Sequence, residues 1–337
     1  MTEGKKPQNS NLPPLAEVTD VHRHYGEFYR LKPVRPSTTN SSLPRVAVIG
    51  NCQGESLRIL LASSGAVDSF RIPPVHEWTA SDLEYVRATI AETDVLISQP
   101  IRDNYRNLPC GTAQLAKYLP AHGRLITYPV LRFNALNPYI AIIRSPNDPS
   151  LNPPVVPYHN LAYVAEFAGL KRVREVDYQA CARQSISQLA TREQAHNCVK
   201  ISDTLAPTPV WHILNHPNNA TLIELARRVL REITPDLSQP TLDAVTADHE
   251  LLGHLQSPID PAAAEFFGVK VRRPVWTLGG EEISEHEIYK QQMAFYRDHP
   301  EVVEAGLARH QELLHHLGYD VAHPADPSAT SLHRESN

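Results

Sequence analysis

Residues 45–54 read Arg-Val-Ala-Val-Ile-Gly-Asn-Cys-Gln-Gly, and this stretch decides the fold. Its first half is a short β-branched run, which is typical of a strand buried in a parallel sheet. Residues 50–54 are rich in glycine and amides and predict a turn. The helix that follows is predicted over residues 55–64, because apolar side chains recur at helical spacing at Leu57, Leu60 and Leu61. The turn therefore places Cys52 between a strand and a helix.

Two further strand-and-helix units follow along the chain. A helix is predicted from Thr79 to about Glu92, and it leads into a strand over residues 94–99. A short helix over residues 112–118 then leads into a strand over residues 124–130. Apolar strands that alternate with helices predict a parallel sheet with right-handed crossovers, and hence an α/β subdomain.

The rest of the chain has a different pattern. Residues 133–160 are rich in proline and asparagine, as loops are, and helices are predicted near residues 161–169, 183–197, 219–233, 283–298 and 300–317. We predict four parts in chain order. These are a poorly ordered N-terminal arm that contains an apolar stretch at Tyr25–Leu31 and docks on the domain, an α/β subdomain, a mainly helical remainder that completes the pocket, and a frayed tail: residues 1–43, 44–132, 133–318 and 319–337.

Composition excludes several classes of protein. The 337 residues carry a formal net charge of −5 with no Lys/Arg-rich block, which argues against nucleic-acid binding. The sequence contains no run of 18 uncharged apolar residues, so no transmembrane helix is predicted. The N-terminal stretch MTEGKKPQNSNLPP lacks the apolar region of a secretory signal. Four scattered cysteines without a C-x-x-C pair favour free thiols and a cytoplasmic location. The 29 prolines predict many ordered, irregular loops.

The turn around Cys52 is the strongest candidate for chemistry. A thiol there lies near the positive end of a helix dipole, among backbone N–H groups, and this setting lowers the pKa of a cysteine. The same donors suit an oxyanion or a phosphate, and Asn51 and Gln53 add side-chain amides on either side. The alternative is a cysteine that only packs under the sheet.

Ser98 and Gln99 end the second predicted strand, before Pro100. Ligands of open α/β sheets bind outside the carboxyl ends of the strands, so we expect Gln99, Cys52 and Tyr128 to converge on one crevice. The alternative is that these residues only finish a strand.

Two segments contribute histidines. His159 lies in the loop-rich region, whereas Pro217 predicts that His216 occupies an exposed turn before a helix. A nucleophilic cysteine needs a base and the base needs an orienting group, so we predict His216 in the first role and Asp203 in the second. A purely structural role for each histidine stays open.

Metal and nucleotide motifs are not found. His249 and His254 are five positions apart, which on a helix turns their rings by about 500° and leaves them about 140° apart. His212 and His216 are separated by a helix break and lack the glutamate of H-E-x-x-H. We therefore predict no metal site, and the absence of G-x-G-x-x-G and of a P-loop argues against nucleotide chemistry.

Taken in order, the motifs resemble the WcbI-type capsular-polysaccharide acetyltransferases over about residues 45–317. The matching motifs are the Gly-Asn-Cys-Gln turn, Ser-Gln-Pro, Tyr-His-Asn, Ile-Ser-Asp and Asn-His-Pro, which begin at Gly50, Ser98, Tyr158, Ile201 and Asn215. The resemblance implies a mainly helical, loop-rich cradle that holds a small α/β subdomain similar to flavodoxin and to SGNH hydrolases. Cys52 stands where SGNH hydrolases have their serine. The Gly-x-Asn-Asp block and the Asp-x-x-His pair of those hydrolases are missing, which argues against simple ester hydrolysis.

The resemblance also implies a reaction, a cofactor and partners. It implies O-acetyl transfer from coenzyme A, bound as acetyl-CoA, to the hydroxyl of a sugar or polysaccharide precursor, together with partner enzymes of a glycan pathway. From it and the motifs we predict a catalytic set of Cys52, His216 and Asp203, with His159 as an alternative base. The cofactor is predicted to contact Gly50, Asn51, Gln53, Gly54, Ser98, Gln99, Arg102, Tyr158, His159 and Asn215. Arginines such as Arg102, Arg132 or Arg144 would meet its phosphates. A thiol-dependent SGNH-like esterase and a non-catalytic binding partner for coenzyme A or a glycan stay open.

Overall fold

The structure is a computed structural model that describes residues 12, 15, 17–32 and 43–321. Most of the predicted arm and tail lie outside the described residues. The docking segment is described: α1 (Asp20–His24) leads to Tyr25, Phe28 and Tyr29, which are buried in an apolar core. The predicted tail begins differently from expectation, because Tyr319 is buried and pairs with Arg172 through the backbone.

The chain forms two compact units that are not contiguous in sequence. The first contains residues 1–132, 186–205 and 215–253, and the second contains residues 133–185, 206–214 and 254–337. The sequence placed a boundary at residue 132, but it assigned residues 186–205 and 215–253 to the helical remainder. They fall in the first unit because the amphipathic helix α7 (Asn219–Ile233) packs its apolar side against α2 (Cys52–Ser63).

The first unit is built on a four-stranded parallel sheet, which confirms the predicted α/β fold. The order is β2-β1-β3-β4, and the strands are Asp68–Ser69, Arg45–Ile49, Val95–Ser98 and Arg124–Thr127. Pairing of Ile49 with Ser98 and of Ser98 with Thr127 aligns the carboxyl ends of the three longer strands. β2 lies on one side of β1 and β3 on the other, so the strand order reverses between β1 and β3. Ligands of such sheets bind at this topological switch point.

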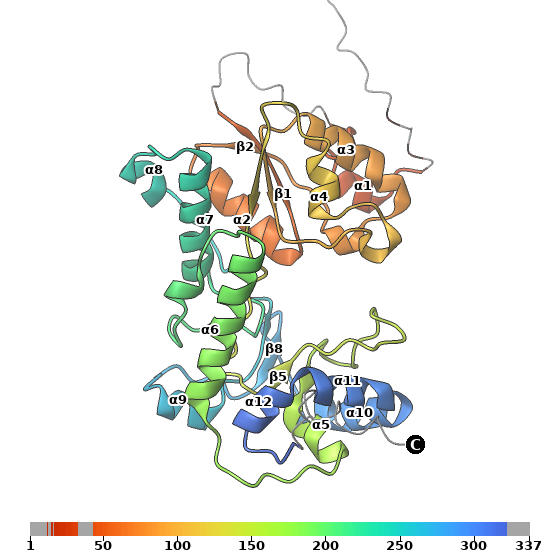
Figure 1. Ribbon diagram of the computed structural model, residues 1–337, viewed down its shortest axis with the longest axis vertical. Coiled ribbons are helices and arrows are strands. Elements are labelled where there is room, and N and C mark those ends of the chain that lie inside the picture. The colour runs from red at the N-terminus through yellow and green to blue at the C-terminus, as the bar shows by residue number, and fades with distance from the viewer. Residues whose placement is uncertain (1–11, 13–14, 16, 33–42, 322–337) are drawn as a thin grey trace, which may run out of the picture. The chain divides into compact units, whose positions relative to one another are not determined.

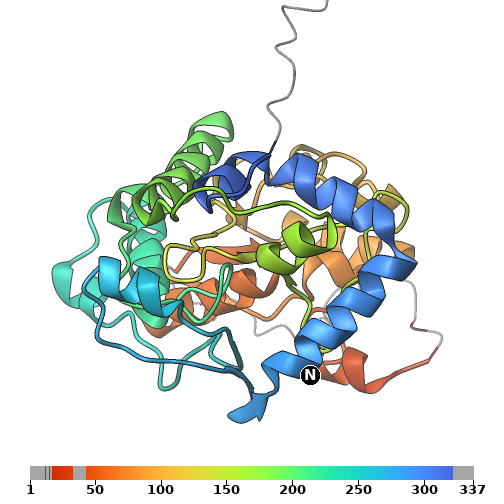
Figure 2. The same cartoon turned by 90° about the horizontal axis from the view of Figure 1, so that it is seen from below.

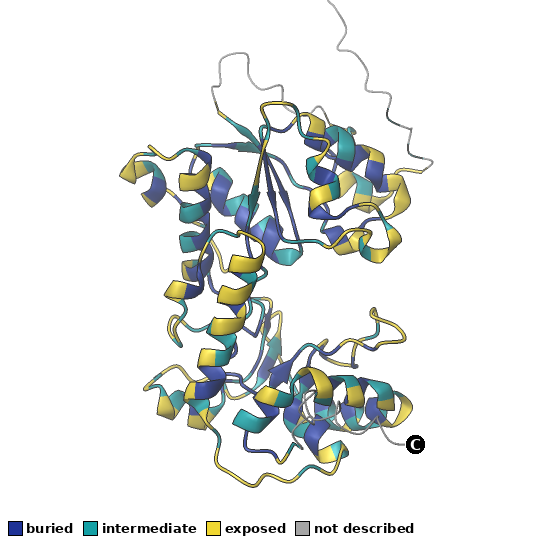
Figure 3. Ribbon diagram, viewed as in Figure 1, coloured by how far each residue is buried: buried dark blue, intermediate teal, exposed yellow. Residues whose placement is uncertain are grey.

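Helices cover both faces of this sheet (Figure 1). Ala47, Ile49 and Leu96 pack into a core with α3 (Leu83–Ala91) and α4 (Thr112–Ala116). Side chains alternate along a strand, so the remaining strand positions face α2 and α7 on the other side. Burial on both faces explains the near-continuous apolar runs of β1 and β3, which are dark blue in Figure 3. The unit also contains α8 (Gln239–Asp243) and single 3₁₀ turns at residues 75–77, 80–82, 105–107 and 202–204.

The second unit is mainly helical. Its central helix, α5 (Leu161–Phe167), packs against α10 (Glu285–Asp298) and α11 (Pro300–Arg309), as Figure 2 also shows. A break at His310 separates α11 from α12 (Gln311–His316), where the sequence predicted one helix over 300–317. The unit also contains α9 (Pro261–Phe266), and helix α6 (Tyr178–Ala195) is divided between the two units at residue 185.

Short strands of the second unit were not predicted. β5 (Ile140–Ala141) pairs with β6 (His159–Asn160), and a second small sheet has the order β7-β8-β9, with strands Leu255–Gln256, Trp276–Leu278 and Glu281–Ile283. Strands of two or three residues are too short for the alternation of apolar and polar residues that reveals a strand in sequence.

Candidate functional site

The candidate site is the turn that joins β1 to α2. The structure begins α2 at Cys52, three residues earlier than the sequence predicted, because the side-chain oxygen of Asn51 accepts a hydrogen bond from the Gln53 N–H at 2.9 Å. This N-cap stabilises the first turn of the helix. Cys52 thus lies at the first position of a 12-residue helix, at the carboxyl end of β1 and beside the topological switch point.

His216 lies beside Cys52 within the first unit. The imidazole Nε2 is 3.9 Å from the Sγ atom of Cys52, although the two residues are 164 positions apart. His216 immediately precedes Pro217 and Asn218, and the side chain of Asn218 caps α7. The packing of α7 on α2 therefore brings the two side chains together. The sequence predicted an exposed turn for His216, but the residue is half-buried.

The acidity of Cys52 differs from expectation. Burial raises the pKa of the Cys52 thiol above its ordinary value, because removal of water penalises the thiolate. Hydrogen bonds from the backbone N–H groups of Gln53 and Cys52 oppose this effect without cancelling it. The predicted lowering of the pKa by the helix dipole is therefore wrong for the described structure. A nucleophilic role for Cys52 would therefore require a base.

Gln53 is a structural hub. Its Nε2 donates to the carbonyl oxygens of Leu131 at 2.9 Å and Asn215 at 2.8 Å. Its Oε1 accepts from the Leu131 N–H at 3.0 Å and from Gln99 Nε2 at 3.1 Å. The side chain is 1% exposed, and both of its donor hydrogens are used. Gln53 thus holds the segment that carries His216 and has no side-chain donor left for an oxyanion.

Gln99 and Ser98 support the turn from the neighbouring strand. Gln99 Oε1 accepts from the Asn51 N–H at 2.9 Å, and the Ser98 hydroxyl donates to the Gln99 carbonyl at 2.8 Å. Both side chains are buried, so their described contacts are internal. The Thr112 hydroxyl donates to the same carbonyl oxygen at 2.8 Å. Thr112 was not predicted to contribute, because it lies 13 positions away on α4.

Tyr128 and Gln99 both lie against the turn that carries Cys52, but both side chains are buried, so a crevice that they share with Cys52 stays a prediction. Tyr128 is fully buried, and its hydroxyl donates to the Ile49 carbonyl at 3.3 Å. A Cβ atom on Gly50 would collide with this hydroxyl and would lie 2.8 Å from Gln99 Oε1, whereas one on Gly54 would lie 3.1 Å from the hydroxyl. The two glycines therefore let the buried tyrosine approach the turn closely.

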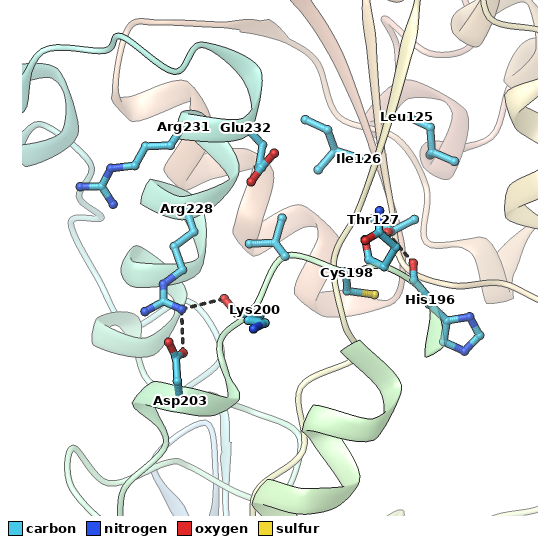
Figure 4. A pocket seen from close by; sticks show the side chains of 12 residues that line it. Leu125, Ile126, Thr127, His196, Cys198, Lys200, Asp203, Arg228, Arg231 and Glu232 are labelled. Carbon is cyan, nitrogen blue, oxygen red and sulfur yellow. Dashed lines mark hydrogen bonds and ion pairs between the residues drawn. The ribbon is translucent and has the colours of Figure 1, made fainter. Parts of the chain in front are cut away.

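Asp203 does not face His216. Its carboxylate accepts from Arg228 Nη1 at 2.6 Å, and Arg228 Nη1 also donates to the Lys200 carbonyl, as Figure 4 shows. The pair lies at a cavity of about 710 Å³ formed at the β4 edge by residues 196–200 and by α7. The expected orienting role of Asp203 is not supported, because an arginine side chain from α7, which sequence spacing cannot reveal, engages the carboxylate.

Two predicted contact residues belong to the second unit. The Tyr158 side chain is part of an apolar cluster with Trp276, and its carbonyl accepts from Gln292 Nε2 at 2.8 Å. His159 is 1% exposed, stacks on Tyr296, and places Nδ1 3.0 Å from the Tyr296 hydroxyl. Burial lowers the pKa of His159 to about 4, so this imidazole is neutral at pH 7. Both residues therefore have core positions, and the imidazole that lies 3.9 Å from the Cys52 sulfur is that of His216.

The remaining predicted residues take different positions. Asn215 contributes its backbone carbonyl to Gln53, and Arg102 is exposed in the loop after β3. Arg144, in the second unit, donates to Asn152 at 2.5 Å. Leu131, which no motif marked, contributes both of its backbone groups to the hub. A backbone contribution leaves no signature in residue type, so sequence reasoning had no means of finding it.

Among the described residues, no group of three His, Cys, Asp or Glu side chains is placed to hold a metal ion. All four cysteines are free thiols. No helix in the described ranges is long and apolar enough to cross a bilayer.

The fold and the turn define a class: an α/β protein with a cysteine–histidine pair at the carboxyl edge of a parallel sheet. Residues 45–237, more than half of the chain, match the family described as polysaccharide biosynthesis enzyme WcbI. The chain belongs to this family and is a polysaccharide biosynthesis enzyme of WcbI type.

A solved structure of WcbI shares the fold. The TM-score is 0.67 at 16% sequence identity, over 82% of this chain and 98% of that chain. That structure is described as native WcbI, a novel polysaccharide biosynthesis enzyme, without a disulfide bond between coenzyme A and a cysteine. No curated protein matches the chain.

Replacement of Gln53 by leucine is expected to destabilise the protein by about 4 kcal/mol. The substitution leaves four buried hydrogen-bonding groups without their partner, each at a cost of about 1–3 kcal/mol before relaxation. Urea unfolding followed by circular dichroism measures the change. Gln188→Leu is the control, because Gln188 is exposed in the same unit and should change stability by less than about 0.5 kcal/mol. Equal unfolding midpoints for the two variants would contradict the stabilising role of the Gln53 hydrogen bonds.

Proposed function

We propose that the chain is a coenzyme A-dependent O-acyltransferase that moves an acetyl group to the hydroxyl of a sugar or polysaccharide precursor. The observation that carries the proposal is the 3.9 Å separation of Cys52 Sγ from His216 Nε2 at the first turn of α2. The order of motifs, which resembles the WcbI-type acetyltransferases, supports the reaction class, and the description of WcbI supports coenzyme A as the donor.

In the first proposed step, Cys52 takes the acyl group from acyl-CoA. His216 Nε2 accepts the thiol proton while the sulfur attacks the thioester carbonyl, so a new carbon–sulfur bond forms and the bond to coenzyme A breaks. The leaving coenzyme A sulfur receives the proton from His216. A base is required because burial keeps the Cys52 thiol protonated. The backbone N–H groups of Cys52 and Gln53 stabilise negative charge on the sulfur.

In the second proposed step, the acceptor hydroxyl replaces Cys52. His216 takes the hydroxyl proton, the oxygen attacks the acyl carbon, and the bond to Cys52 breaks to give an ester. The proton returns from His216 to the Cys52 sulfur, so the enzyme is restored. The Asn51 side chain keeps its NH₂ group as a donor at the turn, since its oxygen caps α2. We assign the oxyanion contact to this group rather than to Gln53.

Mixing the protein with acetyl-CoA in the absence of acceptor is expected to give one acetyl group on Cys52, detected by intact mass and peptide mapping. Calorimetric titration with coenzyme A is expected to show one saturable site. Binding of coenzyme A without an acyl-enzyme, even under rapid quench, would exclude the covalent route and favour direct transfer beside Cys52. Absence of binding would contradict the proposal and favour the esterase. The control is Cys198→Ala, which removes a half-buried thiol of the same unit and should behave as wild type.

A further inference from the structure

The second unit contains a cavity that the proposed acyl transfer does not use. Its volume is about 700 Å³, and it lies between α9 and the segment that follows it, residues 268–274. The walls combine apolar side chains, among them Ile259, Val269 and Val271, with charged ones. All of the lining residues belong to the second unit. The cavity is therefore a feature of one compact body.

The charges of this cavity are unbalanced. Lys270, Arg272 and Arg273 line it with Glu265, a formal balance of +2. Within the described part of the chain, no carboxylate oxygen lies within 4.0 Å of a side-chain nitrogen of these three cations. Other arginines of the chain, such as Arg228 with Asp203, do form an ion pair with a carboxylate. Three cations beside one concave surface attract an anion, and the low-dielectric wall strengthens the field.

Hydrogen bonds hold the guanidinium group of Arg273 in one position. Its Nη2 donates to the carbonyls of Trp211 and His212 at 2.9 Å each, its Nη1 donates to Gln256 Oε1 at 3.3 Å, and its Nε donates to the Ser257 carbonyl. These acceptors are neutral, so they orient the guanidinium without cancelling its charge. Partial burial lowers the pKa of Arg273 to about 10, which leaves the group cationic at neutral pH. An anion in the cavity would offset the cost of this uncompensated charge.

We propose that this cavity binds the phosphate group of a small phosphorylated organic molecule, a sugar phosphate or a nucleotide. A phosphate monoester carries about two negative charges at neutral pH, which match the formal balance of the cavity. The exposed Lys270 and Arg272 side chains reach its oxygens, and Arg273 supplies a fixed positive field. The volume exceeds that of inorganic phosphate, and the apolar wall offers a surface for a sugar or base. This site is independent of Cys52 and does not rest on the acyl-transfer proposal.

Isothermal titration of the full chain at low ionic strength tests the site with six probes: inorganic phosphate, pyrophosphate, ADP, glucose 1-phosphate and, as phosphate-free controls, adenosine and glucose. We expect one saturable site for at least one organic phosphate, tighter than for inorganic phosphate and weakened by added NaCl. In the double variant Lys270→Gln/Arg272→Gln the affinity is expected to fall at least tenfold. Both residues are exposed, so the variant should fold. If ADP binds more tightly than glucose 1-phosphate, the ligand of the cavity is assigned as a nucleotide. If glucose 1-phosphate binds more tightly than ADP, it is assigned as a sugar phosphate.

The matched control is Lys171→Gln/Arg297→Gln, which removes two exposed cations of the same unit that do not line the cavity. It should bind every probe as wild type does. The proposal is overturned if no organic phosphate binds saturably, if adenosine and glucose bind as tightly as their phosphates, or if the cavity variant and the control bind equally. Thermal unfolding of both variants without ligand verifies that neither change has disrupted the unit.

Discussion

Cys52→Ala is expected to lower kcat/KM for the proposed acetyl transfer by about a thousandfold or more, with little change in stability. In the proposed mechanism this change removes the nucleophile, so the covalent route is lost and the residual rate comes from binding and positioning alone. His216→Gln is expected to cost about 10²–10⁴-fold, the range of a general base. Because the two groups act together on one proton, the double variant should be hardly worse than Cys52→Ala. Steady-state release of coenzyme A, followed with a thiol reagent, measures all three.

The same pair determines the expected pH dependence. Burial raises the pKa of Cys52, so its thiolate is scarce at neutral pH and grows as pH rises. In His216→Gln, alkylation of Cys52 by iodoacetamide should be slower at pH 7 than in the unfolded chain and should increase through the alkaline range. The free energy of unfolding changes in the opposite direction to the alkylation rate and falls as pH rises. The raised pKa of Cys52 favours the folded state below the pKa of the unfolded chain, and this contribution is lost above the pKa of the folded chain. Faster alkylation than in the unfolded chain would show that the turn stabilises the thiolate.

Substitution of Gly50 by alanine is expected to destabilise the first unit by about 3 kcal/mol. The added methyl group would collide with the Tyr128 hydroxyl and lie 2.8 Å from Gln99 Oε1, and overpacking of this kind costs about 1–3 kcal/mol or more. Tyr128 is fully buried and cannot turn toward solvent. The loss should appear as a lower urea midpoint and as weaker binding of the proposed coenzyme A, because Gly50 is the first residue of the turn after β1.

A compensating change makes this prediction specific. Tyr128→Phe removes the colliding hydroxyl and loses one hydrogen bond to Ile49, at a cost of about 1 kcal/mol. The double variant Gly50→Ala/Tyr128→Phe should therefore be more stable than the sum of the single changes predicts, by about 1–2 kcal/mol. Gly54→Ala, where the new Cβ lies 3.1 Å from the same hydroxyl, is the milder control. Strictly additive effects would show that the hydroxyl is not the obstacle.

The parallel sheet and the position of its turn could be predicted from sequence. β1 and β3 are buried on both faces, so each appears as a short apolar run, and glycine or proline ends each run. Helix α7 was predicted at its observed bounds, since its apolar stripe follows the helical period. The resemblance to the WcbI family rested on the order of short polar motifs, and the family is confirmed.

The interactions within the site could not be predicted to the same extent. Cys52 and His216 were paired on chemical grounds, and the structure places them together. Asp203 was chosen on the same grounds, yet its carboxylate faces Arg228. The sequence could not distinguish these outcomes, because spacing along the chain does not report which helix face a distant loop meets.

By itself, the sequence determined the strand–turn–helix that carries Cys52, the parallel sheet around it and the family. Those features follow from local periodicity and from short contiguous motifs, which each segment expresses without reference to the others. Only the tertiary structure decided that Gln53 is a hub instead of an oxyanion donor and that the Cys52 thiol is less acidic than its helix position implies. Hydrogen-bond partners and desolvation depend on residues far along the chain, such as Leu131 and Asn215. The same side chain therefore changes its role when folding buries it among them.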